Sequence, residues 1–167
     1  MIGPFQKICV RSLECLIIGL MTTLVLDVTW QVVSRYLLGS PSSWTDELAT
    51  LLMIWVAMLG ASLGFIRQAH LGIDYFVHLL PLKAAKVAQL AVQLMIAFFA
   101  GAILLYGGLE LVKLTLRTEQ VSPALGLKMG LVYLAIPLSG CYILAFAAAD
   151  AIALIRRPQA APAARAD

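Results

Sequence analysis

Charged residues are scarce in this sequence, and that scarcity excludes a water-soluble fold. Only 13% of its 167 residues are Asp, Glu, Lys or Arg, and 62% are hydrophobic. A soluble domain is typically about 25% charged and about 45–50% apolar. The polar stretches are too short to form a separate soluble domain. We therefore expect the function to lie within a membrane or at its surfaces.

Cysteine and histidine are also rare, which argues against metal and cofactor sites. Cys9, Cys15 and Cys141 are odd in number and form no CxxC pair, so neither a disulfide framework nor a metal knuckle is indicated. His70 and His78 fall in one loop, whereas haem ligation in a membrane cytochrome needs histidines placed across a bundle core. We predict no metal and no cofactor.

The sequence contains no pattern typical of an enzyme or a nucleic-acid-binding protein. It has no Ser/His/Asp or Cys/His nucleophile set, no phosphate-binding glycine loop and no zinc motif. The net charge of +3 comes from cations in loops beside apolar runs, which is typical of membrane proteins. We therefore predict no catalysis and no nucleic-acid partner, and we expect contacts with membrane lipids.

Four long apolar runs are present instead, and each is long enough to cross a bilayer. A spanning helix needs about 20 residues, because the hydrocarbon core is about 30 Å thick and a helix rises about 1.5 Å per residue. We predict an all-α integral membrane fold with a four-helix domain over residues 1–155 and a disordered cytoplasmic Pro/Ala-rich tail over residues 156–167. The predicted transmembrane helices cover residues 16–38, 45–66, 87–109 and 127–155.

Turn formers and small residues divide and shape these runs. The sequence from Gly39 to Ser43 predicts the first turn, and Pro137 predicts a kink in the fourth helix. Gly60 and Gly64 have the small-xxx-small spacing that lets two helices approach closely in lipid. We expect a helix-packing face there.

Residues 67–86 differ from the four runs. His70, Asp74 and His78 interrupt apolar residues that recur at helical spacing, and Pro81 ends the pattern. Such a segment can lie along the membrane surface. We predict an interfacial amphipathic segment between the second and third transmembrane helices.

The distribution of lysine and arginine predicts the orientation. Eight of these residues lie at the two ends and in the middle loop, and four lie on the opposite side. Cytoplasmic loops carry the excess of positive charge. We therefore expect both termini to be cytoplasmic.

Three acidic residues lie within or beside the apolar runs, namely Asp27, Glu110 and Asp150. Ionisable residues at membrane depth are costly and are candidates for function. Asp27 is the deepest. It could be a proton or cation site, but we favour a hydrogen bond between helices or subunits for all three.

Several residues from the end of the first helix through the middle loop resemble a known family. The pattern is similar to the small-permease (Q) subunit, or DctQ-like family, of tripartite ATP-independent periplasmic (TRAP) transporters. The matching elements are Arg35-Tyr36, Trp44-Thr45-Asp46-Glu47-Leu48, Trp55, Leu59-Gly60-Ala61, Arg67, His70 and Asp74.

This resemblance implies a sodium-driven secondary transporter of the bacterial inner membrane. Such a system takes up an organic acid delivered by a periplasmic substrate-binding protein. The large (M) subunit, here a separate chain, would hold the substrate and sodium sites and move as an elevator, while the small subunit is a fixed scaffold. The resemblance implies structural, partner-interface or lipid-contact roles for Arg35, Trp44, Glu47, Arg67 and His70.

Two other classes remain open from the sequence. A four-helix proton-coupled multidrug exporter would use a carboxylate in the first helix, for which Glu14 and Asp27 are candidates. It would work alone as a homo-oligomer. A membrane subunit of a redox complex would contain haem, and an absorbance spectrum would detect it.

Overall fold

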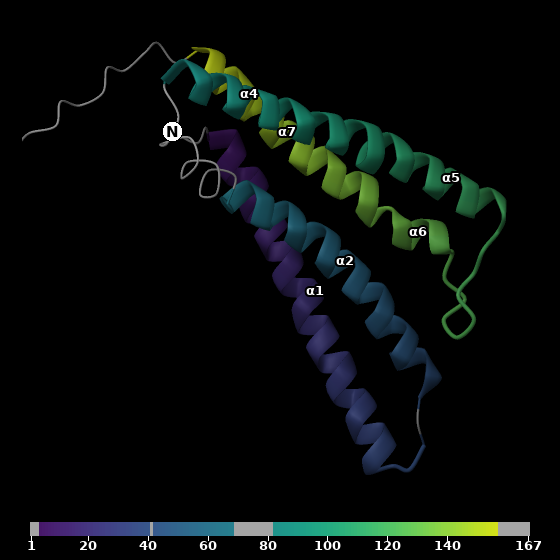
Figure 1. Ribbon diagram of the computed structural model, residues 1–167. Helices are drawn as coiled ribbons and strands as arrows, with labels where there is room; N and C mark the ends of the chain where they lie inside the picture. The colour runs from purple at the N-terminus through teal and green to yellow at the C-terminus, as the bar shows by residue number, and fades with distance from the viewer. Residues whose placement is uncertain (1–3, 41, 69–81, 157–167) are drawn as a thin grey trace, which may run out of the picture.

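Over the residues that the structure describes, the protein is all-helical and contains four helices long and apolar enough to cross a membrane. The computed structural model describes residues 4–40, 42–68 and 82–156. Figure 1 shows the course of the chain. Its helices are α1 (Pro4–Tyr36), α2 (Ser43–Gln68), α4 (Leu82–Phe98), the π-helix η1 (Phe99–Gly107), α5 (Gly108–Arg117), α6 (Met129–Tyr133) and α7 (Ala135–Arg156).

Four candidate spans result, because α4, η1 and α5 follow one another directly and α6 leads into α7. The spans cover Ile8–Tyr36, Ser43–Arg67, Val87–Arg117 and Met129–Ile152. The predicted fold class is therefore confirmed. The second and third helices extend beyond the predicted apolar runs at both ends, since backbone hydrogen bonding continues into polar flanking sequence. The first helix begins earlier than predicted but ends at residue 36, and the fourth begins at residue 129.

The turn between α1 and α2 forms where the sequence predicts it. Gly39 has φ of +63°, a left-handed conformation that commonly ends a helix. The N–H of Ser40 donates to the carbonyl of Ser34 at 3.2 Å. At the start of α2, the fully buried Thr45 hydroxyl donates to the Ser42 carbonyl at 2.8 Å. Both contacts satisfy polar groups at the helix ends.

The fourth span is interrupted near Pro137, as predicted. α6 ends at Tyr133 and α7 begins at Ala135, so the break lies at Leu134. Proline has no N–H to donate to the carbonyl four residues earlier, and its ring clashes with that carbonyl. The N–H of Leu138 donates to Leu134 at 3.2 Å and continues the helix beyond the break.

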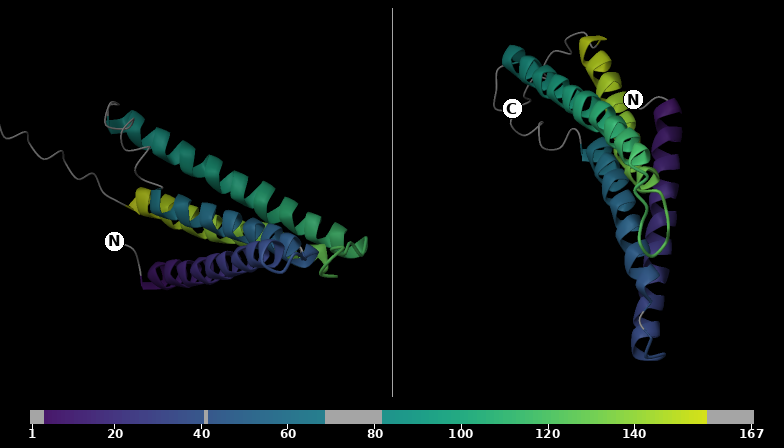
Figure 2. Two further views of the ribbon diagram at one scale, coloured as in Figure 1. Left: turned by 90° about the horizontal axis from the view of Figure 1, so that it is seen from below. Right: turned by 90° about the vertical axis from the view of Figure 1, so that its right-hand side faces the viewer.

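The four spans do not form a closed bundle. α1 packs mainly on α2, α2 also packs on α7, and α7 packs on the α4–η1–α5 span. Figure 2 shows this order across the molecule, and in Figure 1 the two halves diverge toward the residue 36–43 and 118–128 turns. In the most apolar window of each span, 39% of residues are buried in the fourth but 6% in the first. α7 is thus the centre and α1 the outer helix.

Close packing occurs at glycines other than the predicted pair. A Cβ on Gly140 would lie 2.8 Å from Leu104 Cβ and 3.0 Å from Leu105 N, and Gly108 and Gly130 also have contacts of 3.0 Å or less. In contrast, a Cβ on Gly60 or Gly64 would meet no atom within 4 Å among the described residues. The predicted packing face on α2 is therefore open within this chain.

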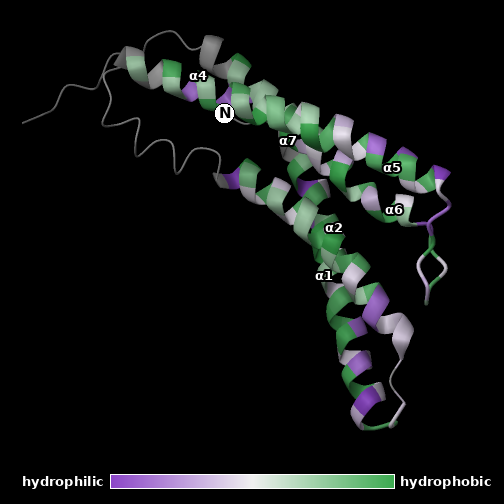
Figure 3. Ribbon diagram, turned by 45° about the vertical axis from the view of Figure 1, so that its right-hand side comes forward, coloured by the Kyte–Doolittle hydropathy of each residue, from purple (hydrophilic) through white to green (hydrophobic). Residues whose placement is uncertain are grey.

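Polar residues gather toward the ends of the spans, as Figure 3 shows by hydropathy. Residues 69–81 and 157–167 lie outside the described residues. The interfacial segment and the tail therefore remain predictions. They include His70, Asp74 and His78.

Candidate functional site

The seam of α1, which is the helix face turned toward its neighbour, changes from apolar to polar side chains along its length. Seam residues that recur three and four positions apart are buried or half-buried: Leu13, Ile17, Leu20, Leu24, Asp27, Gln31 and Ser34. This spacing keeps one helix face turned toward its neighbour. The half of the hairpin nearest the residue 36–43 turn therefore has a polar interior.

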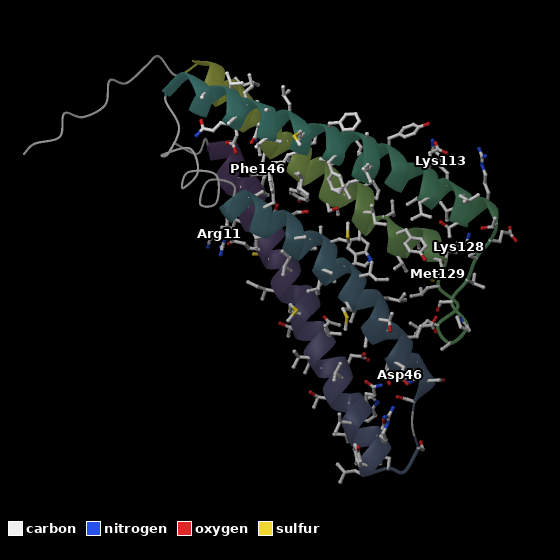
Figure 4. All side chains as sticks on the ribbon, in the orientation of Figure 1. Arg11, Asp46, Lys113, Lys128, Met129 and Phe146 are labelled. Carbon is white, nitrogen blue, oxygen red and sulfur yellow. The ribbon has the colours of Figure 1, made fainter. Side chains whose placement is uncertain are left out.

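Asp46 joins this polar half from α2. Its Oδ1 accepts a hydrogen bond from Gln31 Nε2, and its Oδ2 lies 4.0 Å from Arg35 Nη2. Figure 4 shows Asp46 between the α1 and α2 ribbons. Arg35 and Asp46 are about half exposed, so their attraction is weakened by solvent. Asp46 nevertheless fixes the register of the two helices at this end.

Glu47 reaches away from this hairpin to the loop at residues 118–128. Its Oε2 accepts hydrogen bonds from the backbone N–H groups of Ala124 at 2.7 Å and Leu125 at 3.0 Å. Within that loop, Gly126 has φ of +66° and its N–H donates to Ser122 at 2.9 Å. Glu47 thus tethers the turn of one half of the molecule to a helix of the other.

An open recess lies between α2 and this loop. Its volume is about 540 Å³, and its lining includes two carboxylate residues and the loop backbone. A cavity of this size could accept a side chain from a partner. It is lined by Ser43, Asp46, Glu47, Thr50, Pro123 and Ala124.

Asp27 lies deeper in the hairpin than Asp46. Its side chain is 7% exposed, and both carboxylate oxygens are buried without a hydrogen bond to any described residue. The interhelix hydrogen bond favoured from the sequence is absent from the described part of the chain. A hydrogen bond to another subunit stays a prediction.

The structure brings only some of the predicted site residues together. Arg35, Trp44 and Glu47 lie near the residue 36–43 turn, and Trp44 is 44% exposed. Arg67 lies at the opposite end of α2, where its guanidinium donates to Glu14. His70 is outside the described residues. The predicted set therefore spans both ends of the hairpin.

Glu110 and Asp150 occupy different surroundings from Asp27. Glu110 accepts a hydrogen bond from Lys113 at 2.9 Å, and both side chains are more than half exposed. The bond that the structure gives Glu110 is thus within α5 and not to another helix, and a bond to another subunit stays a prediction. Asp150 is half-buried in α7.

Sequence reasoning missed two polar residues that join helices. Gln31 was not identified as the donor to Asp46, although its spacing four residues from Asp27 and Arg35 was a usable signal. Gln93 is 6% exposed and donates to the carbonyl of Ala147 in α7 at 3.0 Å. No pattern in the sequence identified its partner.

A family profile described as "Tripartite ATP-independent periplasmic transporters, DctQ component" matches residues 24–157. This range includes α1 from residue 24 onward, all of α2, the polar cluster of Gln31, Arg35 and Asp46, and the loop that Glu47 binds.

Three curated relatives illustrate the similarity. The sialic acid TRAP transporter small permease protein of Vibrio cholerae is 33% identical over 102 residues, 61% of this chain and 59% of that protein. The C4-dicarboxylate TRAP transporter small permease protein of Rhodobacter capsulatus is 35% identical over 95 residues, 57% of this chain and 41% of that protein.

The third relative is a longer permease. The isethionate TRAP transporter permease protein DctMQ of Oleidesulfovibrio alaskensis is 26% identical over 125 residues, 71% of this chain and 20% of that protein. The aligned segments thus span less than two thirds of the length of each of the three relatives. The profile match covers most of the chain. The chain is therefore a transporter permease component and not an enzyme, and it is a multi-pass membrane protein. It belongs to the DctQ family of TRAP transporter small permease subunits.

Proposed function

We propose that this chain is a fixed scaffold for a separate large (M) permease subunit in sodium-coupled uptake of an organic acid. The large subunit moves as an elevator and holds the substrate and sodium sites. A periplasmic substrate-binding protein delivers the acid. Relatives named for sialic acid, isethionate and C4-dicarboxylate support an acidic substrate without distinguishing among these classes.

The placement of polar groups carries the scaffold proposal. Among the described residues, the hydrogen-bonded polar cluster and the recess lie at one end of the hairpin. The outer faces of the spans are apolar and exposed within this chain, including Val25, Phe98 and Ile103. Such a molecule offers contact surface to lipid and to another membrane subunit.

Longer relatives support association with the large subunit. In the isethionate permease, the segment similar to this chain makes up about a fifth of one polypeptide. A second relative, the sialic acid TRAP transporter permease of Haemophilus influenzae, matches over 11% of its length. In those proteins the small-subunit segment is covalently joined to the rest of the permease. We propose that the same two parts associate non-covalently here.

We further propose a bacterial inner-membrane location with cytoplasmic termini. This places the residue 36–43 turn, the 118–128 loop and the recess on the periplasmic side, where the binding protein docks. Figure 4 shows Lys113 and Lys128 near that side and Arg11 toward the other. Cysteine labelling of Glu119→Cys and Gln159→Cys in intact cells, in a chain whose native cysteines are replaced, tests this orientation, because both positions follow the ends of membrane spans. We expect labelling at position 119 and protection at position 159, and the reverse pattern would contradict the proposal.

Co-purification in mild detergent tests the scaffold role. We expect the chain to bring down a larger permease in a one-to-one ratio, and uptake of a labelled organic acid after reconstitution to require both proteins and sodium. Recovery of a transport-competent homo-oligomer would refute the scaffold and restore the exporter hypothesis. The ion pair between Glu14 and Arg67 argues against Glu14 as the carboxylate that would exchange protons in such an exporter.

The tether between Glu47 and the 118–128 loop gives a more local test. We expect Glu47→Gln to reduce uptake at limiting binding protein while leaving the complex with the large subunit intact. The matched control is Glu119→Gln, which removes the same charge from an exposed position near that loop. Equal uptake by the two variants would argue against a docking role for the tethered loop.

Asp27→Asn tests whether this chain provides the coupling site. Because we assign sodium coupling to the large subunit, we expect this variant to keep largely normal uptake when assembly is normal. Sodium-dependent uptake across a concentration series is the measurement. Loss of coupling in a normally assembled complex would overturn the scaffold proposal.

A further inference from the structure

Asp27 is a buried acid that the proposed transport role does not use. Only 7% of its side chain is exposed, and both carboxylate oxygens are buried without a hydrogen bond to a described residue. It lies in the membrane-spanning part of α1, on the face that packs against α2. At this depth an unpaired ionised carboxylate is costly.

Nearby donors are already occupied. The hydroxyls of Thr23 and Thr50 each donate to a backbone carbonyl of their own helix, at 2.9 Å in both cases. The side-chain amide of Gln31, one turn from Asp27, donates to Asp46. None of these groups donates to Asp27.

The charged groups nearest Asp27 in the hairpin are engaged with other partners. On α2, Asp46 accepts a hydrogen bond from Gln31. On α1, Arg35 is turned toward Asp46, with 4.0 Å between Arg35 Nη2 and Asp46 Oδ2. Glu47 faces the loop amides instead. No described cation lies within salt-bridge distance of Asp27.

The register of the hairpin places Asp27 level with Thr50 of α2. Gln31 contacts Asp46, so in an antiparallel pair Asp27, one turn earlier, is level with Thr50, one turn later. Asp46 and Thr50 line the open recess, whereas Asp27 is buried on the α1 side of the hairpin.

We propose that Asp27 binds a proton in the folded protein and that the α1–α2 hairpin closes over the neutral carboxylic acid. This inference does not depend on the proposed transport role. Because α1 packs mainly on α2, a neutral Asp27 side chain allows α1 to stay packed against α2, and we call this effect the latch. Removing the proton would leave an unpaired carboxylate buried between α1 and α2, which is costly, and would loosen the hairpin.

Infrared spectroscopy of the reconstituted chain tests the bound proton. We expect a carbonyl band of a protonated carboxylic acid at neutral pH, shifted by deuterium exchange and by isotope-labelled aspartate. Asp27→Asn should abolish this band, and the matched variant Asp46→Asn should retain it. Absence of a labelled-aspartate band in the wild-type protein would overturn the proposal even if Asp27→Asn fails to fold. Its replacement by a carboxylate signal on adding sodium would also overturn it, in favour of a metal-ion site.

The dependence of stability on pH tests the latch. Wild-type protein should lose melting temperature progressively as the pH rises above about 4, the ordinary pKa of an unfolded aspartate, and the loss should level off where the folded protein releases the proton. Asp27→Asn should lack this part of the loss. Both proteins keep the other titrating groups, so the difference between the two curves reports Asp27. Parallel curves would overturn the latch.

Discussion

The α1–α2 half and the α4–α7 half of this molecule are each held together internally by a different kind of interaction. Between α1 and α2, polar side chains join the helices near both ends, through Gln31 and Asp46 at one end and Glu14 and Arg67 at the other. Between α7 and the α4–η1–α5 span, backbones approach closely at glycines such as Gly140. The two halves contact each other where Ser62 of α2 donates to the carbonyl of Ser139 in α7, at 3.4 Å, and where Glu47 accepts hydrogen bonds from the 118–128 loop.

This difference reflects the two ways in which helices associate in lipid. Lipid tails are as apolar as leucine, so burial of apolar side chains gives little drive for helix association, and packing of small residues or interhelical hydrogen bonds must supply it. Association of the helices in the α4–α7 half depends mainly on close packing at small residues, and association of α1 with α2 depends mainly on polar contacts. Substitutions should therefore damage the two halves by separate mechanisms.

The largest effect is expected from Gly140→Ala. The added methyl group would lie 2.8 Å from Leu104 Cβ and 3.0 Å from Leu105 N, so α7 and η1 must move apart. Such overpacking typically costs about 1–3 kcal/mol. Unfolding of the purified chain in detergent measures the loss.

Gly60→Ala is the matched control for that substitution. Its methyl group would meet no described atom within 4 Å, and surface changes of this kind are usually within about 0.5 kcal/mol. Equal destabilisation by both variants would show that the α4–α7 half does not depend on close glycine packing.

A smaller effect is expected from Gln93→Leu. This change removes the buried hydrogen bond from α4 to the Ala147 carbonyl, whose length is 3.0 Å. Interhelical hydrogen bonds in membranes contribute about 0.6 kcal/mol on average and up to about 1.7 kcal/mol. The same unfolding measurement applies, with Gln89→Leu one turn earlier as the control. A greater loss in the control would contradict the assigned bond.

The ion pair between Glu14 and Arg67 should contribute less. The side chains are 30% and 62% exposed, respectively, so solvent screens their attraction. We expect a coupling energy of about 0.2–1 kcal/mol in a double-mutant cycle with Glu14→Gln and Arg67→Ala. The coupling should decrease at high salt, and a salt-independent value would indicate a contact of another kind.

The smallest effect on global stability is expected from Glu47→Gln, because its contacts are confined to one loop. The neutral amide accepts weaker hydrogen bonds from Ala124 and Leu125 than the carboxylate does. Hydrogen exchange at those two amides should become faster while the unfolding temperature is nearly unchanged. Unchanged exchange would contradict the tether that links the two halves.

Much of the fold was predictable because it depends on local properties of the chain. Four spans follow from runs of apolar residues, the first turn from Gly39, and the break in the fourth span from Pro137. Each feature is set by residues within one or two helical turns. The π-helix at Phe99–Gly107 was not predicted, because no sequence rule used here distinguishes it from an α-helix.

The candidate site was predictable only in part. Trp44 and Glu47 were identified with the correct family, but the reach of Glu47 to Ala124 was not. That contact joins residues far apart in sequence, so it depends on how the two halves are placed. Gln31 was missed because its contact with Asp46 depends on the register of α1 against α2, although its spacing of four residues from Asp27 places it on the α1 seam.

The sequence by itself determined the membrane location, the four spans and the family, because hydropathy and local motifs are properties of the linear chain. Only the tertiary structure decided which glycines pack, which acids are paired and that Asp27 is buried without a hydrogen bond. The physical reason is that helix contacts in lipid depend on the rotation and relative depth of each helix. Hydrophobicity alone does not fix either quantity.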